Sequence, residues 1–112
     1  MKYTKKDREM LETVRSYIVQ HYAEKILVED LCRLVGLNEI KLSKGFKDFY
    51  QKTIIQYQID LRMQLAADLL KTDKIIKEVA TQVGYQDWSK FSPHFKKQFG
   101  LTPTQYKQRY TE

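Results

Sequence analysis

Residues 78–103, EVATQVGYQDWSKFSPHFKKQFGLTP, contain two apolar helical segments that meet at a glycine and are followed by a lysine pair. A looser version of this order occurs at residues 29–53, EDLCRLVGLNEIKLSKGFKDFYQKT. The first segment and its glycine recur after 48 residues, so that Val28, Leu31, Val35 and Gly36 correspond to Ile76, Val79, Val83 and Gly84. The second segment recurs after 49 residues, so that Leu42, Phe46 and Lys47 correspond to Phe91, Phe95 and Lys96. The chain therefore contains an internal repeat with a one-residue slip just after the glycine.

Each copy consists of a short helix, a turn opened by a glycine, and a second helix with apolar residues at i and i+4. That order is the outline of a helix-turn-helix. The glycines, Gly36 and Gly84, would supply the positive φ that such a turn often needs. A small residue precedes each glycine by four positions, Cys32 and Ala80, where two helices must approach closely. We therefore interpret Cys32 as a packed residue and not as a nucleophile or a metal ligand.

Composition and charge limit the classes of partner. The 112 residues are 42% apolar, enough for the core of a globular soluble chain, and no apolar run approaches the ~18 residues of a membrane span. A single cysteine forms no internal disulfide, which fits a reducing cytoplasm. The net charge of +6, with +3 in residues 1–56 and +3 in residues 57–112, favours a polyanionic partner, nucleic acid first and an anionic membrane second.

Helical periodicity runs through the whole sequence, and no stretch alternates like a half-buried strand. We predict an all-α fold of seven helices, at about residues 6–23, 28–36, 39–50, 53–71, 75–83, 87–99 and 103–110. Asp87 would cap the sixth helix and Gly100 would end it, while Thr102 would cap the seventh helix at Pro103. The domain is expected to span residues 1–112, with one helix-turn-helix unit at about 28–50 and another at about 75–99. Between them, the helix at about 53–71 has two apolar stripes, which favours a connector packed on both sides over one thick bundle core.

The second helix of each copy has an apolar side and a polar side. The residues expected to point inward are Leu42, Phe46 and Phe49 in the first copy, and Phe91, Phe95 and Phe99 in the second. The residues expected to point outward are Ile40, Ser43, Lys44 and Lys47 in the first copy, and Ser89, Lys90, Pro93, Lys96 and Lys97 in the second. Small side chains that approach base edges, followed by cations that meet phosphate, suit a helix in the DNA major groove. Lysines on one exposed helix are usually only solvated, but two equivalent faces favour DNA.

The quoted stretches closely resemble a known family. VEDLCRLVGLNEIKLSKGFKDF (28–49) and IKEVATQVGYQDWSKFSPHFKKQFGLTPTQYK (76–107) are similar to the two helix-turn-helix units of the AraC/XylS transcription regulators, and YQIDLRMQLAADLL (57–70) to their connector. The resemblance covers about residues 10–110. It implies a bacterial, cytoplasmic transcription regulator that acts on RNA polymerase. Its third and sixth helices would enter successive major grooves of an asymmetric promoter site, which one monomer would fill. The base-contacting positions that it implies are Ile40, Ser43 and Lys44 in the first unit, and Trp88, Ser89, Lys90, Ser92 and Pro93 in the second. The phosphate-contacting positions are Lys47, Lys96 and Lys97.

The chain departs from the family pattern at a few positions. Pro93 stands where an arginine is frequent, Gly45 where a bulky apolar residue is usual, and Gln51 where a glycine usually closes the third helix. Ile40 could at best touch a thymine methyl group. The angle of Trp88 around its helix points toward Phe95 and Phe99, so packing is favoured over base contact. 

These departures keep alternatives open. A helical module that docks its basic faces on an acidic protein is the main one, supported by Gly45 and Pro93, and a nonspecific or membrane-surface binder is a poorer one. The two histidines, His21 and His94, are isolated, so neither a metal site nor a cofactor is expected. No phosphate loop, nucleophile elbow or paired catalytic carboxylate is found, so no enzyme is expected. We therefore expect sequence-specific binding of double-stranded DNA.

Overall fold

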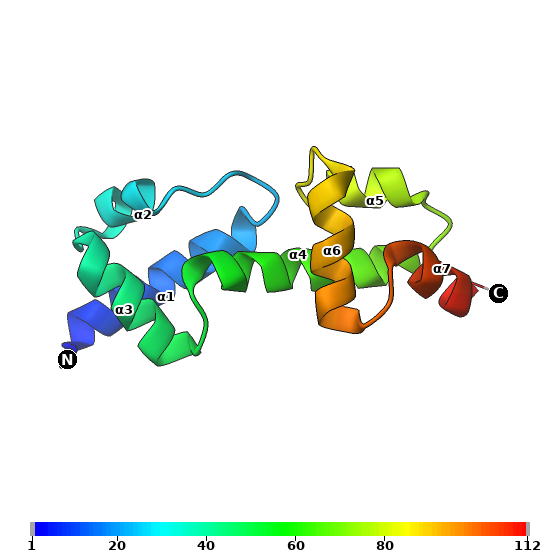
Figure 1. Cartoon of the computed structure of the whole chain (residues 1–112). Helices are drawn as coiled ribbons and strands as arrows, with labels where there is room; N and C mark the ends of the chain where they lie inside the picture. Colours follow the sequence, from blue (N-terminus) through cyan, green and yellow to red (C-terminus); the bar gives the residue numbers. More distant parts are fainter. Residues whose placement is uncertain (1, 112) are drawn as a thin grey trace. The chain divides into compact units, whose positions relative to one another are not determined.

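A computed structural model describes residues 2–111 of the chain, with side chains to residue 110. The described part contains seven α-helices and no strand, which confirms the predicted all-α fold. They are α1 (Lys5–Gln20), α2 (Val28–Val35), α3 (Glu39–Tyr50), α4 (Ile54–Leu70), α5 (Ile76–Gln82), α6 (Trp88–Phe99) and α7 (Pro103–Thr111) (Figure 1). The chain forms two compact units, unit 1 (Met1–Gln58) and unit 2 (Ile59–Glu112). No described helix has the length and apolar character needed to cross a bilayer.

Unit 1 is built on α1. The helix begins at Thr4, whose hydroxyl accepts the N–H of Asp7 at 3.0 Å while the Asp7 carboxylate accepts the N–H of Thr4 at 2.9 Å, a capping box. The buried side of α1 contains Leu11, Val14 and Ile18, and both α2 and α3 pack against this helix. The capping box thus sets where the apolar stripe of α1 starts.

The first helix, predicted to end at about residue 23, ends three residues earlier, at Gln20. Two contacts hold the chain in a turn after that residue. The ring of His21 bonds the carboxylate of Glu24 at 2.6 Å, and the side-chain amide of Gln58 donates to the backbone oxygens of Tyr22 and Glu24 at 2.9 and 2.7 Å. Because Gln58 lies on α4, local periodicity contained no sign of this helix end.

The glycine turn before α3 has the predicted positive φ, but one residue of α3 that was expected to be buried is exposed. Gly36 has a φ of 74°, and Gln51 adopts the left-handed conformation, with a φ of 60°, that its family position usually gives to glycine. Leu42 and Phe46 are fully buried. Phe49, expected to point inward, is 36% exposed because it lies on the rim of α3 under Tyr3, with their ring centroids 5.2 Å apart.

The two ends of α4 lie in different units. In unit 1, Ile54 is buried and the ring of Tyr57 packs edge-on against Phe46, with 5.5 Å between the centroids. In unit 2, Met63, Ala66 and Leu70 have no exposed surface. Each end of α4 thus contributes apolar residues to the core of the unit in which it lies.

Unit 2 repeats the arrangement of short helix, glycine turn and second helix. Gly84 has a φ of 106°, and the Asp87 carboxylate accepts the N–H of Ser89 at 2.9 Å, so the predicted cap of α6 is confirmed. Gly100 ends α6 with a φ of 76°, as predicted. Figure 1 shows α6 running across the second half of α4, and both α5 and α7 pack against α6. The core contains the fully buried rings of Phe91 and Phe95.

Candidate nucleic-acid interface

The outward side of α3, which we call the α3 face, consists of Ile40, Ser43, Lys44 and Lys47. All four side chains are exposed, and Ile40 is 75% exposed. The buried pair on the opposite side, Leu42 and Phe46, fixes the rotation of the helix about its axis. The α3 face therefore has one large apolar side chain near its start and two cations further along.

The start of α3 is held by polar contacts. The Asn38 side chain accepts the N–H of Lys41 at 2.8 Å, and its backbone carbonyl accepts the N–H of Leu42 at 2.9 Å, a neutral cap that leaves the amides of Glu39 and Ile40 without helical acceptors. Lys41 extends toward α1, and its Nζ lies 3.1 Å from the carboxylate of Asp7, whose side chain is only 9% exposed. The hydrogen bond from the Thr4 N–H, followed by the one from Lys41, lowers the pKa of Asp7. This ion pair, which sequence reasoning missed, ties the start of α3 to the start of α1.

The corresponding α6 face consists of Ser89, Lys90, Pro93, Lys96 and Lys97, and all five side chains are exposed. The helix contains no acidic residue, so its charge is purely positive. The carboxylate at its cap, Asp87, has a pKa lowered mainly by the hydrogen bond from the Ser89 N–H. Ser92, also predicted to contact bases, is only half-exposed and lies at the border of the face.

Pro93 lies inside α6, and the helix continues through it from Trp88 to Phe99. Proline has no N–H, so the carbonyl of Ser89 lacks its usual helical donor four residues on. Pro93 therefore does not break the helix. The Ser89 carbonyl is thus a backbone hydrogen-bond acceptor next to the lysines of the α6 face.

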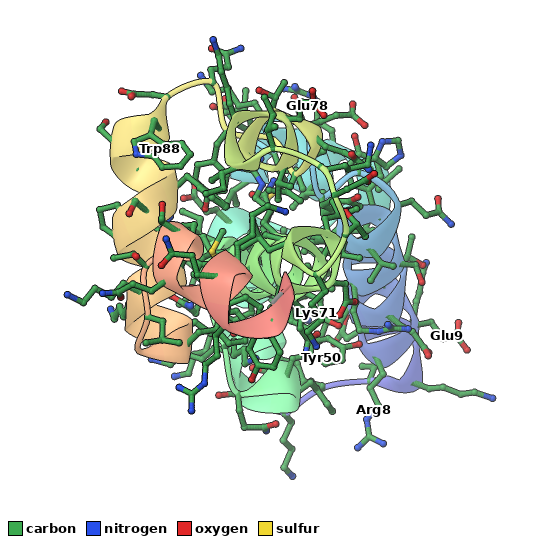
Figure 2. All side chains as sticks on the ribbon, turned by 90° about the vertical axis from the view of Figure 1, so that its right-hand side faces the viewer. Arg8, Glu9, Tyr50, Lys71, Glu78 and Trp88 are labelled. Carbon is green, nitrogen blue, oxygen red and sulfur yellow. The ribbon has the colours of Figure 1, made fainter. Side chains whose placement is uncertain are left out.

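Trp88 is the first residue of α6, and Figure 2 shows it near the upper tip of this helix, where α6 starts. Its indole packs on Phe91, with 5.9 Å between ring centroids, and is 45% exposed. The predicted contacts with Phe95 and Phe99 are replaced by this one, because the side chain of the first residue lies above the first turn. The indole is therefore only partly used in packing, and nearly half of it is available to a partner.

A further cluster on unit 2 contains a histidine that sequence reasoning had treated as isolated. The Tyr85 hydroxyl and the Nδ1 atom of His94 are 2.7 Å apart, and the guanidinium of Arg62 lies 5.1 Å from the centre of the Tyr85 ring. Burial is the largest cause that lowers the pKa of His94, followed by the positive charges of Lys90, Lys97 and Arg62. The imidazole is therefore neutral at pH 7 and supports the inner side of α6. Among the described residues, no group of three or more His, Cys, Asp or Glu side chains could hold a metal ion.

Comparison with known proteins gives consistent matches. Residues 31–109 match the model of a helix-turn-helix domain family. The HTH-type transcriptional activator RhaR of Mannheimia succiniciproducens is 34% identical over 105 residues, which are 93% of this chain and 38% of that protein. The chain spans less than two fifths of the length of the curated relatives that it matches.

Two solved structures are similar in both fold and sequence. The C-terminal domain of AraT, a response regulator from Geobacillus stearothermophilus, superposes with a TM-score of 0.83 at 30% identity, covering 89% of this chain and 84% of that one. The DNA-binding domain of AdpA, a global transcriptional factor solved in complex with a target DNA, gives a TM-score of 0.82 at 27% identity, covering 89% of this chain and 91% of that one.

Proposed function

Because the chain belongs to the AraC/XylS family of helix-turn-helix transcription regulators, we propose that it binds double-stranded DNA sequence-specifically as the DNA-binding part of a bacterial regulator. The observation that carries this proposal is the match between the α3 and α6 faces. Each face is an exposed, cationic side of a helix whose opposite side is fixed by two fully buried apolar residues. A rigid helix with an exposed polar side of this kind is what major-groove recognition requires.

The proposed contacts follow from the chemistry of each face. Ser43, Lys44, Ser89 and Lys90 lie where short or cationic side chains would approach base edges, and Ile40 and Pro93 would offer apolar contact to a thymine methyl group. Lys47, Lys96 and Lys97, further along the helices, would neutralise phosphates. Trp88 and Ser92 would lie at the border of the second contact.

The two helix-turn-helix units, at about residues 28–50 and 75–99, would each occupy one of two successive major-groove segments. Since the α3 and α6 faces differ in sequence, the DNA site would be asymmetric and about 20 base pairs long. One molecule of this chain would fill it. The cytoplasm is the expected compartment and RNA polymerase at a promoter the expected target of regulation.

The alternative, a protein-interaction module, now rests on Pro93 alone. Gly45, its other support, has a packing explanation, because a Cβ there would lie 3.0 Å from the Tyr3 ring and 3.1 Å from Leu11. A glycine required by packing says nothing against DNA binding.

Selection from randomised duplex DNA, followed by footprinting of the selected sequences, tests the proposal. We expect one asymmetric site, protected by a monomer. Ser89→Glu, which adds a negative charge to the α6 face, should abolish selective binding, whereas Gln108→Glu, the same charge change on an exposed residue of α7, should have little effect. A failure to enrich any sequence, or a palindromic site filled by two copies, would contradict it.

A further inference from the structure

The segment that precedes α1, residues 2–4, lies against α3 and is held there by Tyr3. We call this segment the N-terminal arm. The Tyr3 hydroxyl donates to the Asp48 carboxylate at 2.6 Å, and its ring meets that of Phe49 edge-on. The hydrogen bond to Asp48 is the main cause that raises the pKa of Tyr3 to about 12, so the phenol remains a donor at neutral pH. The arm is thus fastened at its middle residue.

Two further residues shape the seat of the arm. Gly45 leaves the space that the Tyr3 ring occupies, since a Cβ at this position would lie 3.0 Å from the Tyr3 Cε1 atom. The guanidinium of Arg8 lies 5.5 Å from the centre of the Phe49 ring, and Figure 2 shows Arg8 near the start of α1. Gly45 weakens the helix, but the absence of a side chain there lets the N-terminal arm lie close to α3.

The fastened arm brings a lysine to the start of the α3 face. Lys2, Asn38, Ile40 and Lys41 line a surface cavity of about 330 Å³. Ile40 belongs both to this cavity and to the α3 face, so the two are continuous. The Lys41 charge is shared with Asp7, and Glu39 adds a negative charge in the first turn. Lys2 is therefore the cation of the cavity that forms no ion pair with any described residue.

We infer that the N-terminal arm is part of the DNA interface and that Lys2 binds a backbone phosphate in this cavity, beside the bases that the α3 face contacts. The inference rests on the proposed function. The cavity has room for a phosphodiester, and the Lys2 ammonium lines it together with residues at the start of α3, where a helix N-terminus also favours an anion. Because the contact is to phosphate, it contributes affinity without sequence preference.

Lys2→Ala tests the inference directly, in the full chain with any affinity tag at the C-terminus. Loss of one phosphate contact should lower affinity roughly eightfold at 0.1 M monovalent salt and reduce the slope of log K against log salt by about 0.9. The base preference should be unchanged. The matched control is Lys25→Ala, an exposed lysine of unit 1 outside the cavity, which should change both quantities much less.

Tyr3→Ala, which releases the arm, provides a second measurement. In that variant Lys2→Ala should cause little further loss of affinity, whereas two independent effects would multiply. In the chain with Tyr3 in place, Lys2→Ala and Lys25→Ala should differ in their effects on DNA affinity and salt slope. Equal effects of the two substitutions would overturn the inference. If the unchanged chain selects no DNA sequence, the proposed function itself is wrong. If the unchanged chain does select a sequence but Lys2→Ala behaves like Lys25→Ala, only the inference about Lys2 is wrong.

Discussion

Gly45→Ala should destabilise the protein although it improves helix propensity. In an exposed helix the change would add about 1 kcal/mol to the free energy of unfolding. Here the new methyl group would lie 3.0 Å from Tyr3 Cε1 and 3.1 and 3.3 Å from the two δ-carbons of Leu11. Leu11 is 1% exposed and has no space to retreat, so Tyr3 must move and stretch its 2.6 Å bond to Asp48. Overpacking of this kind costs ~1–3 kcal/mol, which leaves a net loss of about 1 kcal/mol.

Thermal unfolding followed by circular dichroism at 222 nm measures this balance. A loss of about 1 kcal/mol corresponds to a Tm lower by roughly 4 °C in a domain of this size. The matched control is Ser43→Ala on the exposed side of the same helix, which should raise the Tm slightly through propensity alone. In a Tyr3→Ala background, Gly45→Ala should cost less, because one of the two crowded neighbours is gone. A Tm increase for Gly45→Ala as large as that for Ser43→Ala would refute the packing argument.

Three other predictions concern unit 2 and the roles of the lysines. Lys96→Ala should lower affinity similarly on all DNA sequences and reduce the salt slope by about one, whereas Lys44→Ala should also change which sequence is selected. A change of sequence preference in Lys96→Ala would contradict these roles. Pro93→Arg should shift preference toward guanine at one base pair, by ~1–3 kcal/mol in a competition assay, with the Tm unchanged or slightly higher; an unchanged preference at every base pair would place position 93 outside the groove. The pKa of His94 is lowered in the folded chain, so its stabilising contribution is complete above its ordinary value of 6.5 and is lost as pH falls from there through the folded pKa. Between pH 7 and pH 5, His94→Gln should therefore lose less stability in urea unfolding than the unchanged chain, and parallel losses would show that His94 is not the group responsible.

Much of the fold was predictable from local patterns in the sequence. The seven helices, the positive φ of Gly36 and Gly84, and the Asp87 cap depend on residues within about four positions of one another. The exposed lysines of the α3 and α6 faces were predictable for the same reason, since a helical period places them opposite buried phenylalanines.

Other features were not predictable, because each depends on a residue distant in the chain. The first helix ends early under the amide of Gln58, 36 residues beyond the carbonyl of Tyr22 that it bonds. Phe49 lies exposed on the rim of α3 beside Tyr3, although its spacing matches the apolar stripe.

Gly45 shows the difference most clearly. From the sequence it is a helix-weakening departure from a family pattern, and its cost follows from backbone entropy alone. In the folded chain it is the point where Tyr3, 42 positions earlier, lies against α3. Hydrogen bonds within a helix and its period of 3.6 residues are local, so the sequence encodes them directly. A contact between residues 3 and 45 exists only after α1 and α3 have packed, and for that reason the seat of the N-terminal arm emerges only from the tertiary structure.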